Sequence, residues 1–517
     1  MKLQSFKKTL LVGFILCAVL KANAQEVFRS VALQKEITSV QPFTGIVLWH
    51  NNEYLNQYND AIQLEFSYMK YSDIVTQRGV YNWTALENVL NAVASRGHQA
   101  IIRFYFVYPE NLPWEDGTTT VPQYIKDLPD YSDFQGIFED YDRPKVTWFP
   151  DWRHPELQQF ALEFYSEFAN RYDNDPRLAF VQTGFGLWSE YHVYNCRITV
   201  DGTTYNAAQM VGIGFPSKTF QEQFFRHLDA SFQQTPWSVS INVADTQYSP
   251  VNDKPELKSL KFGLFDDSFM SESHHLWNEP KWQSLGAERY KTTPGGGEFN
   301  YYSTFDQQNV LNPNGLRGRT FEEWAAQFHI SYMIGNDQPY PWMPFRHRVR
   351  EASMATGYKF KLTEFLMSDT QSRLTFTNTG TAPIYYDAYP EINGIRSTES
   401  LKGLSPGETR IFTIPISTDS PNVRIYSPHI LSGQEIQFAA NTISTGISSL
   451  SGFSVQLIHN QLEMSADCDV HLFDIHGKPA GTWHNVRSAD ISAYPTGFYI
   501  AVVSCKGETL RLKIIRK

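Results

Sequence analysis

The chain is poor in charged residues and in cysteine. Only 19% of its 517 residues are Asp, Glu, Lys or Arg, and it has four cysteines. Disordered chains are rich in charge and poor in aromatic residues, whereas 15% of this chain is aromatic, so that class is excluded. The 44 basic residues are outnumbered by 54 acidic ones and form no basic stripe, which excludes an ordinary nucleic-acid-binding protein. At roughly 100–200 residues per domain, the length predicts two to four domains.

The four cysteines show neither a CxxC pair nor a zinc-like spacing with histidine. Cys468 and Cys505 lie in two strand-like runs near the C-terminus and are candidates for a disulfide in an oxidising compartment. Cys196 is interpreted as a buried small hydrophobe rather than a nucleophile. We therefore predict neither a metal site nor a cofactor.

Long hydrophobic runs are also missing, and the apolar run Thr9–Leu20 belongs to a secretory signal. Three lysines precede it, and Ala22-Asn23-Ala24 provides a small-x-small cleavage pattern before Gln25. A membrane anchor is the alternative, but a span needs about 20 apolar residues. The sequence predicts a signal peptide over residues 1–24 and a protein that is secreted or held at the outer cell surface, with no transmembrane segment.

From residue 25 to 357, short apolar runs alternate with helical patterns. The pattern of apolar positions predicts helices over Trp83–Ser95, Pro155–Arg171, Phe220–Phe232 and Phe321–His329. Eight strands alternating with helices predict an α/β fold, a (β/α)₈ TIM-like barrel. The eight predicted strands are Gly45–Leu48, Ala61–Tyr68, Ala100–Phe106, Leu178–Thr183, Ser238–Val243, Leu260–Phe265, the segment around Gly297–Tyr301, and Ile330–Ile334.

After residue 357 the pattern changes to short alternating strands separated by turns. These predict a small all-β sandwich over 358–440, with strands at Tyr358–Leu366, Ser372–Thr377, Ile384–Tyr386 and Thr409–Ile416. A Ser/Gly-rich linker is predicted over 441–452, and a last all-β domain over 453–517.

Two glutamates follow predicted barrel strands, where the reacting groups of such barrels lie. Glu190 ends the fourth strand between Trp188 and Tyr191, an apolar setting that raises the pKa of a general acid. Glu298 follows three glycines at the seventh strand, and these glycines would allow the backbone to approach a ligand closely. Two such carboxylates about 5–9.5 Å apart are what glycoside hydrolysis requires.

Further polar and aromatic residues at strand ends are candidates for substrate binding. Arg103, at the end of an apolar strand, would orient the nucleophile or bind a substrate carboxylate. Asp245 and Asp337 are alternatives to Glu298 as the second carboxylate. The predicted substrate-binding set is Trp49, His50, Arg103, Tyr105, Trp188, His192, Asp266 and Asp267.

Two other segments invite a functional interpretation. The insertion over 107–153 follows the third strand, so we expect it to overhang the barrel mouth, the alternative being a surface excursion with its own small core. His274 and His275 adjoin Glu272, but no third metal ligand follows at a suitable spacing.

The last 65 residues resemble the C-terminal sorting domain of type IX secretion cargo. The resemblance rests on Val470–Lys478 (VHLFDIHGK), on Ile491–Ile500 (ISAYPTGFYI) and on the basic end Lys513–Lys517, in this order. It implies a partner, the type IX secretion machinery, and export across the outer membrane. The alternative is an ordinary fibronectin-like accessory module.

Residues 40–430 resemble a pair of uncharacterised secreted domains that joins a glycosidase-like barrel to a β-sandwich. The resemblance rests on Gly97–Arg103 (GHQAIIR), Gly186–His192 (GLWSEYH), Gly295–Glu298 (GGGE) and Asn378–Tyr385 (NTGTAPIY). Gly79–Trp83 (GVYNW) is similar to the opening segment of clan-A-type glycoside hydrolase barrels. Hydrolase barrels of this type usually have Asn before the fourth-strand Glu, where this chain has Ser189.

The sequence therefore predicts a secreted glycoside-hydrolase-like protein whose partner is a poly- or oligosaccharide. Glu190 would be the acid/base and Glu298 the nucleophile. A non-catalytic carbohydrate-binding or surface-interaction protein is the alternative, and a structural surface component is a third.

Overall fold

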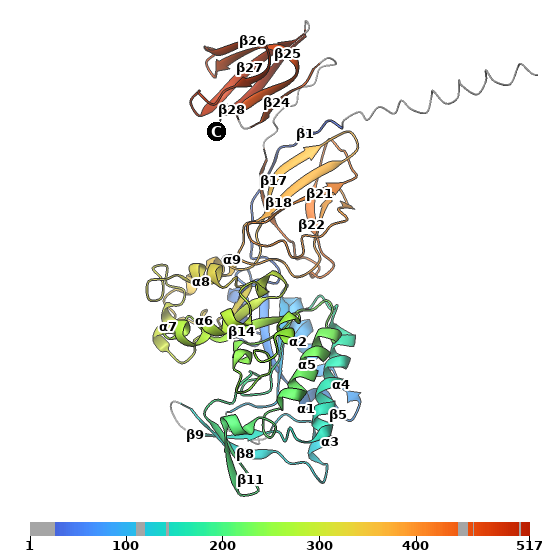
Figure 1. Cartoon of the computed structure of the whole chain (residues 1–517), viewed down its shortest axis with the longest axis vertical. Coiled ribbons are helices and arrows are strands. Elements are labelled where there is room, and N and C mark those ends of the chain that lie inside the picture. Colours follow the sequence, from blue (N-terminus) through green and yellow to red (C-terminus); the bar gives the residue numbers. More distant parts are fainter. Residues whose placement is uncertain are drawn as a thin grey trace, which may run out of the picture.

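The computed structural model describes residues 26–109, 119–140, 144–442, 453–458, 460–505 and 508–516. In these residues a barrel is followed by a two-sheet domain and by a C-terminal sheet domain, stacked along the long axis (Figure 1). The predicted signal peptide and residues 443–452 of the predicted linker lie outside the described residues. No helix within the described ranges is long and apolar enough to cross a membrane.

The first domain is a closed barrel of eight parallel strands, which confirms the predicted fold class. Each strand overlaps one of the eight predicted runs, and β16 pairs with β3 to close the ring. The strands are β3 (Gly45–Trp49), β4 (Leu64–Lys70), β7 (Gln99–Tyr105), β10 (Leu178–Gln182), β13 (Trp237–Ser240), β14 (Phe262–Phe269), β15 (Gly295–Phe299) and β16 (Tyr332–Ile334).

Helices flank the barrel strands, and their ends follow the capping rules. In α4, Pro155 occupies the first turn and the His154 side chain accepts a hydrogen bond from the Glu156 amide, while the Ser217 hydroxyl caps α5. The α-helices are α1 (Tyr71–Ile74), α2 (Thr84–Ser95), α3 (Gln123–Lys126), α4 (Pro155–Tyr172), α5 (Lys218–Ser231), α6 (His274–Leu285), α7 (Thr304–Asn309), α8 (Phe321–Gln327) and α9 (Val349–Met354). Short 3₁₀ helices cover Leu55–Gln57, Ala207–Met210, Ile241–Ala244, Pro255–Ser259, Arg289–Lys291 and Arg346–Arg348.

A four-stranded antiparallel sheet lies beyond the ends of β7 and β10. It joins β8 (Phe134–Glu139) and β9 (Pro144–Phe149) of the predicted insertion to β11 (Cys196–Val200) and β12 (Thr203–Asn206), at the far end of the barrel from the C-terminal domains (Figure 1). Cys196 is buried in β11, as predicted, and burial raises the pKa of its thiol. A small ribbon of β5 (Val75–Gln77) and β6 (Val80–Tyr81) completes this half of the chain.

The second domain has a six-stranded and a three-stranded sheet around one core. The larger sheet contains β17 (Phe360–Met367), β18 (Ser372–Asn378), β21 (Thr409–Ile414) and β23 (Phe438–Thr442), and the smaller contains β19 (Tyr389–Ile392), β20 (Ile395–Arg396) and β22 (Val423–Tyr426). Side chains from both sheets meet in the same cluster of buried apolar residues.

Two details of this domain differ from the sequence prediction. The larger sheet also contains β1 (Arg29–Ser30) and β2 (Leu33–Lys35), which we had assigned to the barrel. Strands of two or three residues are too short to show an alternation of apolar and polar positions. Their partners lie more than 300 positions away, so the sequence around them does not predict the pairing. Ile384–Tyr386 is not a strand; its buried side chains pack toward the barrel, and the Tyr386 hydroxyl donates to the carbonyl of Ala179.

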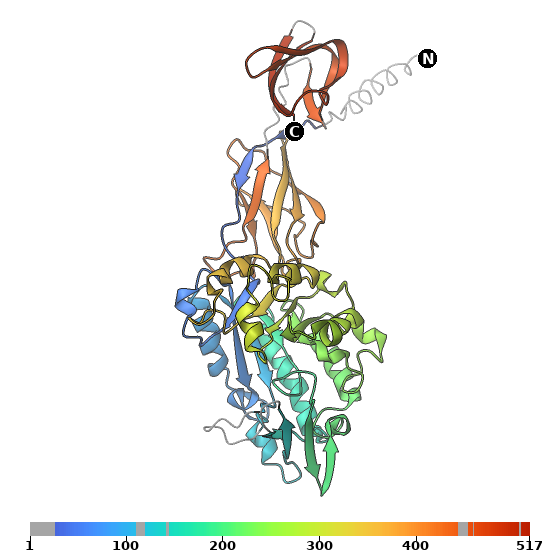
Figure 2. The ribbon, with the colours of Figure 1, turned by 90° about the vertical axis from the view of Figure 1, so that its left-hand side faces the viewer.

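The two-sheet domain covers the end of the barrel at which the strands begin. Its core is continuous with side chains inside the barrel, including Val47, Phe180 and Tyr332, and the ring of Phe43 stacks on Tyr386 at 4.3 Å. Figure 2 shows this domain pressed against one end of the barrel, with the sheet of β8, β9, β11 and β12 at the other. The carboxyl ends of the strands are therefore left for a functional site.

The C-terminal domain is a five-stranded antiparallel sheet with its own apolar core. Its strands are β24 (Val455–Ile458), β25 (Gln461–Asp474), β26 (Pro479–Asp490), β27 (Gly497–Cys505) and β28 (Glu508–Arg516).

The motif residues of this domain have structural roles in its turns. The Asp474 carboxylate accepts hydrogen bonds from the amides of His476 and Lys478, and Gly477 has a φ of 78°, in the left-handed region that favours glycine. Cys468 and Cys505 are both buried free thiols. They are the next pair after Asp469 and Ser504 in the β25–β27 register, so the thiols lie opposite each other.

Candidate active site

Arg103 occupies the middle of the barrel mouth and is fully buried. It lies near the end of β7 with its side chain pointing inward, where its guanidinium lies 4.3 Å from the centre of the Phe265 ring. It donates to the Gln182 side-chain oxygen, to the Tyr68 hydroxyl at 2.9 Å and to the Trp188 carbonyl at 3.3 Å. A planar cation with this many partners is held in one orientation.

Arg103 also forms an ion pair with Glu298. Its Nη2 donates to Glu298 Oε1 at 2.8 Å, and the Glu298 side chain keeps 13% of its surface exposed. Burial raises the pKa of Glu298, and the charge and hydrogen bond of Arg103 oppose that rise. Arg103 therefore favours the ionised form of Glu298 and offsets part of the effect of burial.

The three glycines before Glu298 have a packing role that differs from the predicted one. A methyl group on Gly296 would overlap the ring of Tyr332, and one on Gly297 would overlap the backbone of Asp266. The glycines thus admit a tyrosine ring into the barrel interior and bring β15 close to β14, whereas we had expected them to admit a ligand.

Glu190 lies on a tight loop after β10. Side chains at Gly184 and Gly186 would overlap the carbonyls of Ser189 and His192, and Trp188 and Ser189 have φ values of 52° and 62°. The Ser189 hydroxyl donates to the Phe104 carbonyl at 2.6 Å. Ser189 is thus a fully buried part of this loop and presents no group to the mouth.

Glu190 is nearly buried and surrounded by polar partners. Burial, followed by the negative charge of Asp267, raises its pKa well above the usual value. His192 Nε2 lies 2.9 Å from Glu190 Oε2, and burial lowers the pKa of His192 to about 4. Because the amide of Tyr194 donates to His192 Nδ1, the neutral imidazole carries its proton on Nε2 and donates it to Glu190.

Arg103 links the two glutamates across the mouth. Its Nη1 lies 3.9 Å from Glu190 Oε1, and its Nη2 bonds Glu298 Oε1. Since the terminal nitrogens of one guanidinium are only about 2 Å apart, the two carboxylate oxygens lie within roughly 9 Å of each other. This upper limit admits both the separation of about 6.5–9.5 Å of inverting hydrolases and the separation of about 5–5.5 Å of retaining ones.

Several predicted substrate-binding residues lie at this mouth. Asp267 approaches His192 Nε2 at 3.8 Å and is 27% exposed, the most open of the acidic side chains. Tyr105 and Trp49 both pack edge-on against Tyr68, at 5.7 and 5.9 Å. The Trp188 ring packs edge-on against Phe138 of β8 at 5.6 Å, which connects the insertion sheet to the mouth.

Two predicted residues lie elsewhere. Asp266 is fully buried and faces α6, where it accepts hydrogen bonds from Asn278, Trp282 and His274. Successive side chains of a strand point to opposite faces, so Asp266 points outward when Asp267 points inward. His50 follows the end of β3, and burial lowers its pKa. The charges that also act on this pKa are Glu65 and Arg96, which pair outside the barrel.

Tyr68 and Gln182 belong to the site, although the sequence prediction did not include them. The Tyr68 hydroxyl accepts a hydrogen bond from the Arg103 guanidinium, and Gln182 accepts from Arg103 and donates to the Tyr332 hydroxyl at 2.7 Å. The signal that would have found them is strand alternation, which places both on the inward face of β4 and β10.

The alternative carboxylates have other surroundings. Asp245 accepts a hydrogen bond from the Tyr194 hydroxyl at 3.3 Å, behind His192. Asp337 lies in the loop after β16, and burial raises its pKa. His274 bonds Asp266 and is buried, so it takes part in packing α6 rather than in a metal site with Glu272.

One group of side chains has donor atoms placed as a metal site requires. The ligand atoms of Glu190, His192 and Asp267 all lie within 4.8 Å of one another. Two carboxylates and a neutral imidazole suit a divalent cation such as zinc, but the Arg103 guanidinium next to Glu190 opposes a second positive charge there.

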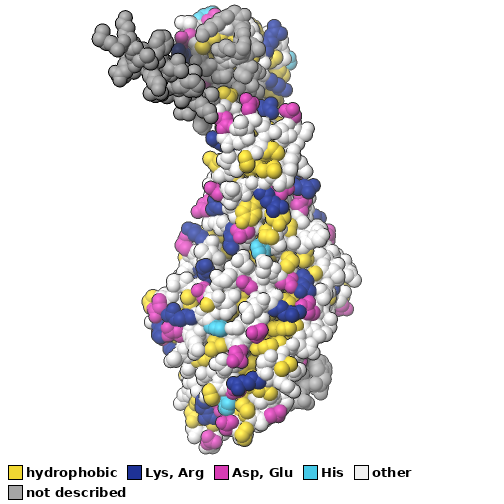
Figure 3. All heavy atoms as spheres, turned by 90° about the vertical axis from the view of Figure 1, so that its right-hand side faces the viewer, with side chains coloured by type: hydrophobic (Ala, Val, Ile, Leu, Met, Phe, Trp, Pro, Cys, Tyr) yellow, Lys and Arg dark blue, Asp and Glu magenta, His cyan; other side chains and the backbone are white. Residues whose placement is uncertain are grey.

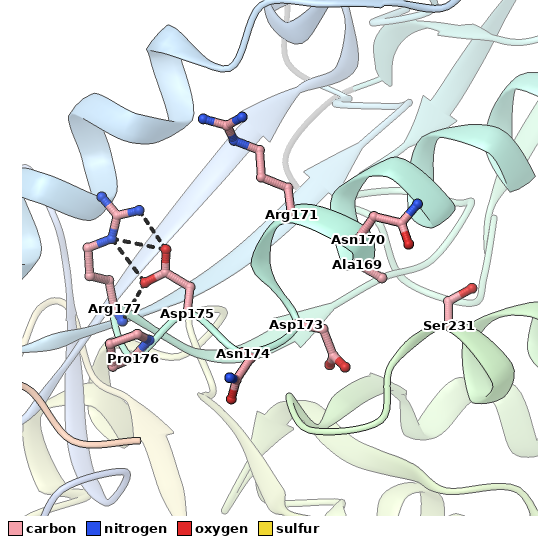
Figure 4. Close-up of a pocket in the computed structure, with 9 residues that line it drawn as sticks. All are labelled: Ala169, Asn170, Arg171, Asp173, Asn174, Asp175, Pro176, Arg177 and Ser231. Atoms are coloured by element: carbon pink, nitrogen blue, oxygen red, sulfur yellow. Dashed lines mark hydrogen bonds and ion pairs between the residues drawn. The ribbon is translucent and has the colours of Figure 1, made fainter. Parts of the chain in front are cut away.

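A surface hollow lies away from the mouth. A hollow of about 660 Å³ lies between the end of α4 and the start of β10, near the two-sheet domain (Figure 4). Its carboxylates are already occupied: Asp173 accepts amide hydrogen bonds from residues 233–235, and Asp175 pairs with Arg177. On the face that Figure 3 shows, acidic and basic side chains are interspersed, without the basic stripe of a nucleic-acid-binding surface.

Comparisons with known proteins give only distant likenesses. No family model matches the chain, and no curated protein matches it. Among solved structures, the chain is similar to the catalytic domain of a β-amylase from Paenibacillus polymyxa (TM-score 0.40, 10% identity, 61% of this chain and 99% of that one). It is also similar to an α-amylase from Malbranchea cinnamomea (0.30, 11%, 70% and 87%) and to a β-galactosidase from Rahnella sp. R3 (0.27, 11%, 47% and 42%).

Proposed function

We propose that this protein is a glycoside hydrolase that uses Glu190 and Glu298 at the barrel mouth. The observation that carries the proposal is the single buried arginine that approaches both carboxylates unequally. Arg103 bonds Glu298 at 2.8 Å but lies 3.9 Å from Glu190. Two carboxyl groups whose environments push their pKa values apart provide an acid and a nucleophile in one site.

The proposed reaction has two steps. An oxygen of Glu298 attacks the anomeric carbon, the bond to the departing sugar breaks, and Glu190 gives its proton to the oxygen that leaves. Water then attacks the glycosyl-Glu298 ester, Glu190 takes up the water proton, and the Glu298 carboxylate is released. Arg103 bonds Oε1 of Glu298, which leaves Oε2 for the attack.

The protonation states needed at the start agree with the surroundings of each group. The pKa of Glu190 is raised by burial and by Asp267, so Glu190 holds a proton that Asp267 accepts in a hydrogen bond. The neutral His192 donates to the other side of Glu190 and adds no positive charge. Asp267 is thus a positioning residue for the acid.

The proposal is tested by scoring binding and bond cleavage separately. The mature protein is incubated with starch, xylan, soluble β-glucan, galactomannan and pectin, and reducing ends are counted. Replacing a general acid costs roughly 10²–10⁴ in rate. In Glu190→Gln the rate of reducing-end release should therefore fall by that factor, while the glycan still binds. The control is Glu163→Gln, which changes a half-buried acid on α4 that accepts a hydrogen bond from Gln159. Unchanged release in Glu190→Gln would reject the assignment.

A non-catalytic glycan-binding protein on the same scaffold is a second candidate, and Ser189 favours it. The family that the barrel resembles usually has an Asn at this position, and here the residue is buried and bonded to the backbone of the loop. Binding by the wild type without any reducing-end release would establish this alternative.

We also propose that the chain is exported and that residues 453–516 direct its passage through type IX secretion. The support is the motif order in the sequence and the use of Asp474 and Gly477 to form the turn between β25 and β26. Expression of the full chain in a type IX-competent host, with and without residues 453–517, tests this. Equal amounts outside the cell would reject it.

A further inference from the structure

The exposed aromatic side chains of the barrel gather on one side of its mouth. Within the described residues, the barrel's exposed Phe, Tyr and Trp side chains all follow β14, β15 or β16. They are Trp277, Tyr301, Tyr302, Phe305 and Trp342. The side above β7 and β10 instead has the antiparallel sheet of β8, β9, β11 and β12.

Trp342 is held flat, although 62% of its surface is exposed. Its ring stacks on Tyr340 with centres 4.4 Å apart and planes 14° from parallel. Tyr340 in turn packs edge-on against Tyr54 at 5.0 Å. One face of the indole is therefore supported from behind, and little side-chain entropy remains to be lost when a ligand covers the other.

The loop that holds Trp342 is tied to the mouth. Asn336 accepts hydrogen bonds from the Trp49 amide at 3.1 Å and from the Asn52 side chain at 2.8 Å. Tyr301 lies three residues after Glu298, and its hydroxyl bonds the backbone of Asn336. Burial, and to a smaller extent the charge of Glu298, raises the pKa of this hydroxyl. These contacts place the start of the Trp342 loop beside the ends of β3 and β15.

We propose that Trp342, stacked on Tyr340, is a sugar-binding platform for a distal unit of a long glycan chain. The inference rests on the proposed function and narrows its substrate class to polysaccharides and long oligosaccharides. A pyranose ring presents a flat face of C–H groups that packs on an aromatic face, and a neutral glycan needs no charge complementarity at the platform. The proposal places Trp342 beyond the sugar units next to Glu298, so a substrate of one or two units should not reach it.

The test compares long and short ligands of the same sugar. Binding to the five polysaccharides above, and to the matching hexa- and disaccharides, is measured for the wild type and for Trp342→Ala. Losing a buried aromatic contact of this size weakens binding about tenfold. We expect that loss for the polymer and the hexasaccharide, and less than a twofold change for the disaccharide.

The matched control is Phe498→Ala, which removes an aromatic side chain that is 48% exposed in the C-terminal domain. Melting temperatures of both variants establish that the fold is intact. If the wild type binds the polymer and Trp342→Ala binds it equally well, the platform is rejected while the proposed function stands. If the wild type binds none of the glycans, the proposed function and the platform are both rejected.

Discussion

Replacing Arg103 should destabilise the barrel by an amount that depends on pH. In Arg103→Met, Glu190 and Glu298 lose the buried cation between them, and Gln182 and Tyr68 lose a hydrogen-bond donor. Breaking a buried ion pair by removing one partner costs about 3–5 kcal/mol. For a domain of this size, that corresponds to a decrease in melting temperature on the order of 10 °C.

The direction of the pH dependence follows from the carboxyl groups. The pKa values of Glu190 and Glu298 are raised in the folded protein, so each group favours folding when protonated, and that contribution is lost as the pH rises through the raised pKa. Without Arg103 the two pKa values rise further. The decrease in melting temperature of the variant relative to the wild type should therefore be largest at pH 7.5. It should be smaller at pH 4.5, where both carboxyls hold protons.

Differential scanning calorimetry at the two pH values measures this deficit. Arg289→Met is the matched control, because Arg289 is half-buried and donates to the backbone carbonyls of Leu260 and Phe262 rather than to a carboxylate. Burial lowers the pKa of Arg289 to about 10, so it stays charged at both pH values. The decrease in melting temperature of Arg289→Met should therefore be the same at both pH values. An equal deficit at both pH values in Arg103→Met would refute the reasoning.

Three further outcomes are expected. Gly296→Ala should lower stability by about 1–3 kcal/mol in urea titrations, because the methyl overpacks the barrel interior, whereas Gly497→Ala, in open space, should not. Reducing-end release should fall as the pH rises through the raised pKa of Glu190, and a rate that stays flat up to pH 9 would contradict its role as the acid. Oxidised glutathione should convert Cys468 and Cys505 of the mature protein to an intramolecular disulfide, which leaves Cys196 as one titratable thiol after unfolding, and three titratable thiols would contradict this.

The barrel could be predicted from the sequence because its strands are buried on both faces. Such strands appear as continuous apolar runs, and each of the eight runs overlaps a strand of the barrel. The two-sheet domain was predicted less completely. Its strands β1 and β2 lie at the other end of the chain from their partners, and strand pairing over such a distance leaves no local signal.

The site was predicted in outline, but the directions of individual side chains were not. Arg103, Glu190 and Glu298 lie together as the strand order implied. Asp266 and Asp267 were predicted as equals, although only Asp267 faces the mouth. Choosing between neighbours requires the register of the strand relative to the barrel interior, and this register is fixed by packing with other strands.

The central claim is that Glu298 forms a bond to the substrate, and the most direct test is the rate of reducing-end release by Glu298→Gln on a polysaccharide that the wild type cleaves. Glutamine keeps the size of the side chain and its hydrogen bond from Arg103, but it is not a nucleophile. We predict that binding is retained within a few-fold and that release falls at least about a hundredfold. Release at the wild-type rate in Glu298→Gln would contradict the claim.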